Sequence, residues 1–270
     1  MKQRIRYFCL TLLVMVAGMA SAQDVVENPV AQIGSKGYAT LQEAIAEAQS
    51  GATIELLENV DATGYYKENA RMPISKSMTI NGNGRTVTVA SKGFGVGMNA
   101  SEKIDVTFKD ITIQNPSSGG RCIDTRGNIG TLTIDNSKLS TGGGNYDQPL
   151  TIGGNQSDAA TVTITNSSIQ TNDAGTAYYA IITFNPVNMT ISNSTIKGWA
   201  CIYAKGPNGS TGSAGSVFTI DNSTIVSSNV YSGNSNSFSA FMIEDNNVAV
   251  NVTNSNVTIQ NTGDQILSIG

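Results

Sequence analysis

A ten-residue phrase that occurs six times constrains the fold more than any other feature of this sequence. VTITNSSIQT begins at Val162, and related phrases begin at Val106, Leu132, Met189, Phe218 and Val250. The phrases align on Asp110, Asn136, Asn166, Asn193, Asn222 and Asn254, which are 26, 30, 27, 29 and 32 residues apart. A period of this length is typical of a solenoid, an array or a propeller.

The phrase alternates apolar and polar residues with period two. Val162 and Ile164 are apolar, whereas Thr163 and Thr165 are not, and this pattern is typical of half-buried strands. It excludes helical solenoids. The longer repeats of WD and kelch propellers and the leucine lattice of leucine-rich repeats are also missing.

Each repeat contains three strand-like pieces joined by turns. In the repeat that begins at Val162, these pieces are 162–164, 167–170 and, after a variable loop, 180–184. Three short strands per turn predict a coil of an all-β, parallel β-helix. Each coil would hydrogen-bond to the next, about 4.8 Å further along the axis.

The Asn of the phrase has a structural interpretation. At the bend between the first two strands one residue tends toward left-handed dihedral angles, which Asn tolerates. Stacked coils would place these amides above one another, where they can hydrogen-bond as a ladder. We expect this role for Asn136, Asn166, Asn193, Asn222 and Asn254.

Two segments carry a resemblance to a known family. ISKSMTINGNGRTVTV (74–89), followed by VTFKDITIQN (106–115), resembles the opening coils of right-handed β-helix proteins of the pectin-lyase-like superfamily. VAQIGSKGYATLQEAIAEAQSGATIELLENV (30–60) resembles the amino-terminal cap of many secreted proteins of gut Bacteroidetes. The resemblance implies a single-stranded right-handed parallel β-helix with an N-terminal capping helix.

The first 22 residues read as a signal peptide. Lys2, Arg4 and Arg6 precede an apolar stretch that is too short to span a bilayer, and cleavage is expected after Ala22. The mature protein is therefore expected to be secreted, periplasmic or on the outer cell surface. Without the three signal-peptide cations, 13 of the 16 Lys and Arg remain against 20 Asp and Glu. This acidic balance argues against nucleic acid and membrane insertion.

We expect a cap over residues 23–60 and β-helix coils over residues 61–270. Thr40 and Glu43 form a capping box, and an apolar helical face follows, with Gly51 as the stop. Such a helix covers the open end of the first coil. The other end, ILSIG, has no covering segment, so either the natural protein continues or the last coil makes an end-to-end contact with a partner.

The search for chemistry centres on RCIDTRG. The chain has no His, which excludes Ser-His and Cys-His catalysis and His-based metal sites. Polysaccharide lyases of the superfamily use acidic Ca²⁺ ligands and an Arg base, for which Asp124, Arg126 and Arg121 are the nearest candidates. One acid between two arginines is a poor Ca²⁺ site, so we interpret the group as a local ion pair and predict no metal or cofactor.

Cys122 and Cys201 precede equivalent third strands three coils apart. This places them about 14 Å apart, beyond the reach of a disulfide. We expect two free, buried thiols.

Aromatic residues give the remaining functional signal. Tyr178, Tyr179 and Trp199 directly precede the third strands of consecutive coils at Ala180 and Ala200. If they face outward, they form a stripe that can stack on sugar rings, with a polysaccharide or surface glycan as partner. The sequence therefore predicts a non-catalytic, adhesin-like or glycan-binding protein. The alternatives are a lyase or other carbohydrate-active enzyme acting on an acidic glycan, with Ca²⁺, and a structural spacer.

Overall fold

The computed structural model describes residues 26–65, 71–142, 144, 146–154, 158–171, 179–207, 212–227, 239–260 and 266–269. The predicted signal peptide (1–22) and Tyr178 lie outside these residues. No helix within the described ranges is long and apolar enough to cross a membrane.

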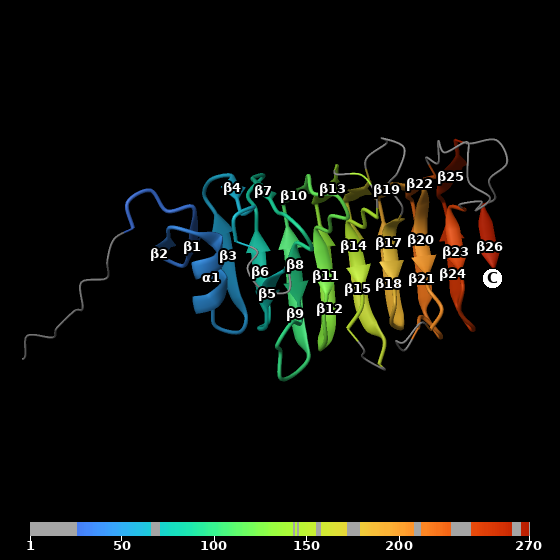
Figure 1. Cartoon of the computed structure of the whole chain (residues 1–270), viewed down its shortest axis with the longest axis horizontal. Coiled ribbons are helices and arrows are strands. Elements are labelled where there is room, and N and C mark those ends of the chain that lie inside the picture. Colours follow the sequence, from blue (N-terminus) through green and yellow to red (C-terminus); the bar gives the residue numbers. More distant parts are fainter. Residues whose placement is uncertain are drawn as a thin grey trace, which may run out of the picture.

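The chain winds into a right-handed parallel β-solenoid whose coils stack along one axis (Figure 1). The described strands form one sheet of ten and two sheets of eight, which we call sheets A, B and C. Each coil contributes one strand to each sheet, and strands of neighbouring coils pair in parallel. The all-β, three-strand coil expected from the repeat is confirmed.

The bounds of the strands follow the repeat. In hydrogen-bonded order, sheet A contains β2 (Lys36–Tyr38), β1 (Ala31–Ile33), β3 (Ala52–Leu56), β6 (Met78–Asn81), β9 (Ile104–Lys109), β12 (Ile129–Asp135), β15 (Ala160–Thr165), β18 (Val187–Ser192), β21 (Val217–Asp221) and β24 (Ala249–Thr253). Sheet B contains β4 (Val60–Asp61), β7 (Thr86–Thr88), β10 (Thr112–Asn115), β13 (Lys138–Thr141), β16 (Ser168–Gln170), β19 (Thr195–Gly198), β22 (Thr224–Ser227) and β25 (Asn256–Ile259). Sheet C contains β5 (Met72–Ile74), β8 (Phe94–Val96), β11 (Ile123–Thr125), β14 (Leu150–Ile152), β17 (Tyr179–Thr183), β20 (Ala200–Ala204), β23 (Phe241–Ile243) and β26 (Leu267–Ile269).

The core occupies the interior of the coils. In β15, Val162 and Ile164 are buried, whereas the threonines between them face away, as period-two alternation requires. Ile164 pairs in register with Ile134 of the preceding coil and Ile191 of the following one. Columns of β-branched side chains therefore run along the axis and hold the coils together.

The amino-terminal segment covers the first coil. β1 and β2 form an antiparallel hairpin, and α1 (Leu41–Glu47) follows it at the blue end of the solenoid (Figure 1). The capping box is present, with two 3.2 Å hydrogen bonds between Thr40 and Glu43. Leu41, Ala44 and Ile45 of α1 are buried in the same core as the coils. The capping helix is confirmed, although it ends at Glu47, before Gly51.

At the other end, the last coil leaves apolar side chains exposed. The exposed fractions are 39% for Val252, 53% for Ile266, 45% for Leu267 and 76% for Ile269. An end-to-end contact at this coil stays a prediction.

The alignment of Ala180 with Ala200 predicts that Tyr179 and Trp199 occupy the same position on adjacent coils. The register of these third strands differs from that prediction by one residue. Tyr179 of β17 pairs with Ala200 of β20, so Tyr179 and Trp199 do not occupy the same position on adjacent coils. Both strands are buried on both faces. No alternation of apolar and polar residues therefore shows which of their side chains point inward. The sequence pattern is therefore uninformative at this point.

Candidate functional site

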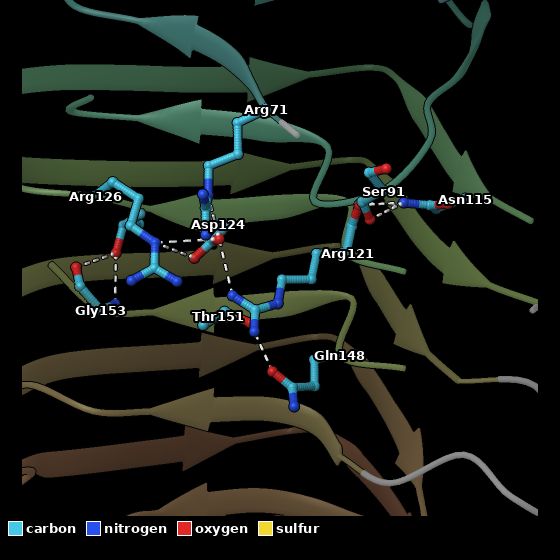
Figure 2. Close-up of polar contacts among 10 residues, drawn as sticks. Arg71, Ser91, Asn115, Arg121, Asp124, Arg126, Gln148, Thr151 and Gly153 are labelled. Carbon is cyan, nitrogen blue, oxygen red and sulfur yellow. Dashed lines mark hydrogen bonds and ion pairs between the residues drawn. The ribbon is translucent and has the colours of Figure 1, made fainter. Parts of the chain in front are cut away.

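An arginine cluster surrounds one buried carboxylate on the outer side of sheet C. Asp124 lies in β11 between Ile123 and Thr125, and its side chain has no exposed surface. Arg71 Nε lies 2.6 Å and Arg121 Nη1 2.8 Å from Asp124 Oδ2. Arg126 Nε lies 3.2 Å from both carboxylate oxygens. Figure 2 shows the three guanidinium groups converging on this carboxylate.

The stacking of the coils brings these residues together. Arg71 precedes β5, and Asp124 lies on β11, which is two coils further along sheet C. Between them, Gly95 of β8 pairs in register with Asp124. A Cβ at Gly95 would stand 3.0 Å from Arg71 Cβ and 3.2 Å from its Cδ, closer than side chains normally pack. The absence of a side chain at Gly95 therefore leaves room for the Arg71 side chain to cross β8.

This geometry is that of an ion-pair network. The local ion pair expected for Arg121, Asp124 and Arg126 is confirmed, and Arg71 is a partner that the sequence pattern did not reveal because it lies 53 residues away. A Ca²⁺ ion needs several accessible oxygen ligands, whereas Asp124 is enclosed by cations. No group of three or more acidic, Cys or His residues suited to a metal was found within the described parts of the chain.

Lys92 adds a fourth cation to this surface. It lies in the turn before β8, where Ser91 O accepts hydrogen bonds from Arg121 N (3.0 Å) and Asn115 Nδ2 (2.9 Å; Figure 2). Burial, and next the positive charge of Arg71, lower the pKa of the Lys92 ammonium. Burial likewise lowers the pKa of Arg121, although its pairing with Asp124 opposes that shift.

The aromatic residues form a second cluster on sheet C. The rings of Tyr179 and Tyr203 are 4.6 Å apart between centroids. Trp199 packs with Ala200, and Tyr179 and Met242 lie against them, outside the main core. Trp199 is only 3% exposed, so the arrangement in which its ring faces solvent is not found. The Trp199 ring does not face solvent because it packs beneath neighbouring side chains.

The bends between sheets A and B take the expected conformation. The φ angle lies between 44° and 51° at Asp110, Asn136, Asn166, Asn193, Asn222 and Asn254. Asn and Asp reach this region at lower cost than other side chains because their polar groups hydrogen-bond locally. The left-handed bend is confirmed in every repeat phrase.

The prediction of a continuous ladder of Asn amides is only partly right. Asn222 Nδ2 donates to Asn193 Oδ1 at 2.7 Å, as predicted. Asn166 instead donates to Asp135 Oδ1 at 3.1 Å, and the amide of the last phrase likewise bonds to the aspartate before the bend of the preceding coil. A carboxylate within reach is a stronger acceptor than a neutral amide, and it replaces the amide rung.

The unbroken ladder is made of the serines that follow the bends. In each pair of coils, a serine N–H donates to the serine Oγ of the next coil at 2.9 to 3.2 Å. Each hydroxyl in turn donates to the carbonyl two residues earlier, at 2.6 to 2.8 Å. The members are Ser137, Ser167, Ser194, Ser223 and Ser255. The Ser that follows the bend Asn in five of the phrases is the sequence signal for this ladder, whereas the expectation from the sequence concerned the Asn alone.

A shallow groove of about 600 Å³ follows the same bends. Polar side chains from five successive coils line it, and serine, threonine and Lys138 groups lie between them. The bend residues in the groove are Asn83, Asp110, Asn136, Asn166 and Asn193. The groove thus presents amide and hydroxyl groups in a row, at the spacing of the coils of about 4.8 Å.

The two described cysteines are free and buried, as expected. The Cys122 thiol donates to the carbonyls of Ile113 and Ser140, both at 3.3 Å. Burial raises the pKa of Cys122 and raises that of Cys201 to about 12. Both are therefore inert packing residues.

Residues 36–146 match the model of a family described as "Putative pectate lyase-like adhesive domain". No curated protein and no solved structure matches the chain. The matched segment runs from β2 to just beyond β13 and contains the whole arginine cluster with Lys92. The aromatic cluster lies outside it.

Proposed function

We propose that this pectin-lyase-like β-helix protein is a secreted, non-catalytic, adhesin-like protein that binds glycans along the side of its solenoid. The family description supports the adhesin-like role. The basic and apolar segment that ends at Ala22 supports secretion. Glycan binding is supported by the groove along the bends between sheets A and B.

The row of polar bend residues in that groove carries the glycan-binding proposal. The side chains of Asn136, Asn166 and Asn193 are exposed. Each amide has two donor hydrogens and an acceptor oxygen, so it retains capacity after the bonds along the row are made. Sugar hydroxyl groups both donate and accept, and a linear glycan laid along the axis would meet one bend per coil. We therefore place the contact in this groove rather than at Trp199.

The lyase alternative has weaker support in the geometry. A general acid, base or metal ligand must reach the substrate, whereas Asp124 is enclosed and neutralised by arginines. Incubation with acidic polysaccharides and Ca²⁺, followed by ultraviolet absorbance, tests for the unsaturated products of a lyase. We expect none.

Binding is tested by passing the mature protein over an immobilised panel of neutral and acidic polysaccharides. Asn166→Gly removes a groove amide while Gly tolerates the φ of 51°. Asn254→Gly is the matched control, because Asn254 has a φ of 49° and donates to an aspartate in the same way, yet lies outside the groove. We expect Asn166→Gly to weaken retention several-fold and the control to behave as wild type. Equal retention by both variants would remove the groove as the binding surface.

A further inference from the structure

The groove along the bends between sheets A and B has a definite length. Its lining runs from Asn83, in the bend after β6, to Asn193, in the bend after β18, and the bends after β9, β12 and β15 lie between them. Neighbouring strands of sheet A pair in register, so these bends stand one above another at the coil spacing of about 4.8 Å. The groove therefore offers one polar position per coil over five coils.

The bend amides keep hydrogen-bonding groups that the described residues do not use. Asn136 and Asn166 each donate one N–H to an aspartate of the preceding coil, and within the described chain their carbonyl oxygens accept no hydrogen bond. Asn193 has the reverse arrangement, because its Oδ1 accepts from Asn222 at 2.7 Å and its Nδ2 donates to no described acceptor. All three groove amides are exposed. The row thus presents acceptors at two coils and donors at a third.

The charges around the groove disfavour an acidic ligand. Among the described residues that line it, only Asp110 and Lys138 carry a charge. Lys109 lies beside the groove, 3.6 Å from Asp110 Oδ2, so its charge is already balanced, and Asp135 adds a second carboxylate directly before the next bend. A glycan with a carboxylate or sulfate on every residue would bring like charges against these aspartates, with Lys138 alone to offset them. The groove is therefore suited to uncharged sugars.

The straight row of bends also selects the shape of the ligand. A glycan can meet one bend per sugar residue only if successive rings advance by about the coil spacing of 4.8 Å. Chains joined through equatorial bonds at C1 and C4 are extended ribbons whose rings follow one another at nearly this interval. Their alternate rings are flipped, but each ring carries hydroxyl groups on both edges. Chains with an axial bond at C1, such as α-1,4-glucans, curve away from a straight row.

We propose, on the basis of the glycan-binding function proposed above, that this groove holds a neutral, extended, equatorially 1,4-linked glycan such as a β-1,4-glucan, mannan or xylan. The ligand lies along the axis with one sugar residue at each lining bend. Its hydroxyl groups donate to Oδ1 of Asn136 and Asn166 and accept from Nδ2 of Asn193. Single hydrogen bonds to exposed amides contribute little, so affinity depends on how many coils the glycan covers.

The test is frontal affinity chromatography of oligosaccharides of increasing length over the immobilised mature protein. The β-1,4-linked glucose, mannose and xylose series are the probes. The malto-oligosaccharides change only the linkage of the glucose series, and β-1,4-glucuronate oligomers add a carboxylate to each residue of the same backbone. Asn193→Gly removes the last amide of the groove, and Gly tolerates its φ of 49°. Asn254→Gly, with the same φ outside the groove, is the matched control.

We expect at least one β-1,4-linked series to bind with an affinity that rises about 2- to 10-fold per added sugar, which is the effect of one neutral hydrogen bond. The rise should level off at five residues, the number of lining bends. In Asn193→Gly it should level off one residue earlier, and Asn254→Gly should behave as wild type. The maltose and glucuronate series should bind about 10-fold more weakly, because they lose contacts at several bends.

The outcomes separate this proposal from the broader one. If polysaccharides are retained through Asn166 but affinity does not depend on oligosaccharide length, the extended ligand is wrong and glycan binding stands. The same holds if malto-oligosaccharides or glucuronate oligomers bind best, or if the length profile of Asn193→Gly matches that of wild type. If the protein binds no oligosaccharide and no polysaccharide, both proposals are wrong.

Discussion

Replacement of Asp124 by Asn should destabilise the protein strongly, although the two side chains have nearly the same size. The change removes the charge that balances three guanidinium groups, whose side chains are 10%, 15% and 36% exposed. Removal of one partner from a buried pair costs roughly 3 to 5 kcal/mol, because the other charge is left uncompensated. The partial exposure of Arg126 lets water screen part of that cost. We therefore expect a loss of about 3 kcal/mol in the free energy of unfolding.

Urea unfolding followed by circular dichroism measures this loss. With an m value of about 3 kcal/mol per molar urea, the midpoint should fall by about 1 M. Asp158→Asn is the matched control, because it removes a carboxylate from a Lys103 pair whose side chains are 52% and 70% exposed. Exposed pairs contribute about 0 to 1 kcal/mol, so its midpoint should hardly move.

A double-mutant cycle isolates the pair itself. Arg71→Met should cost much less in the Asp124→Asn background than in wild type, since the two residues share a 2.6 Å contact. If Asp124→Asn and Asp158→Asn lowered the midpoint equally, or if the Arg71 and Asp124 effects were additive, the claim that this carboxylate holds the cluster would be wrong.

Three further changes test the coil. Ile164→Asp places an unpaired carboxylate in the core and should cost several kcal/mol, whereas Thr163→Asp on the outer face should cost far less; equal melting temperatures would mean that the register is wrong. Ser194→Ala removes a buried rung and leaves the backbone N–H of Ser167 unpaired. The free energy of unfolding should therefore fall by about 1 to 3 kcal/mol, and a fall below about 0.5 kcal/mol would contradict the ladder. Thiol titration at pH 8 should find Cys122 and Cys201 unreactive in the native protein, because burial raises the pKa of each, and both free after denaturation; a missing thiol would indicate a disulfide.

The repeat pattern predicts those parts of the fold that rest on local chemistry. Alternation in the first strand places Ile164 inside, Asn166 supplies the left-handed bend, and Thr40 with Glu43 starts the capping helix. Each of these depends on neighbours within a few residues, so one repeat contains the information. Stacking of the coils then repeats this local structure along the axis.

Contacts between coils are harder to predict, because they depend on which residues the loop lengths bring into register. Asn166 bonds to Asp135 rather than to Asn136, and Tyr179 pairs with Ala200 rather than with Trp199. Residues that determine such contacts are separated by a whole repeat or more. The pattern of one phrase does not show which acceptor stands above it.

The arginine cluster illustrates the same limit at a longer range. Arg121, Asp124 and Arg126 lie within one short segment of the sequence, and this spacing predicts an ion-pair group. Arg71 reaches them from two coils away, across Gly95, and only the stacked structure shows that it does.

Whether the solenoid holds glycans without cleaving them is tested most directly by one measurement on the immobilised mature protein. Polysaccharides are passed over it in the presence of Ca²⁺, while retained carbohydrate and the ultraviolet absorbance of the eluate are recorded together. We expect retention that falls in Asn166→Gly but not in Asn254→Gly, with no rise in absorbance. Unsaturated products in the eluate, or no retention of any polysaccharide, would contradict a non-catalytic, glycan-binding adhesin-like protein.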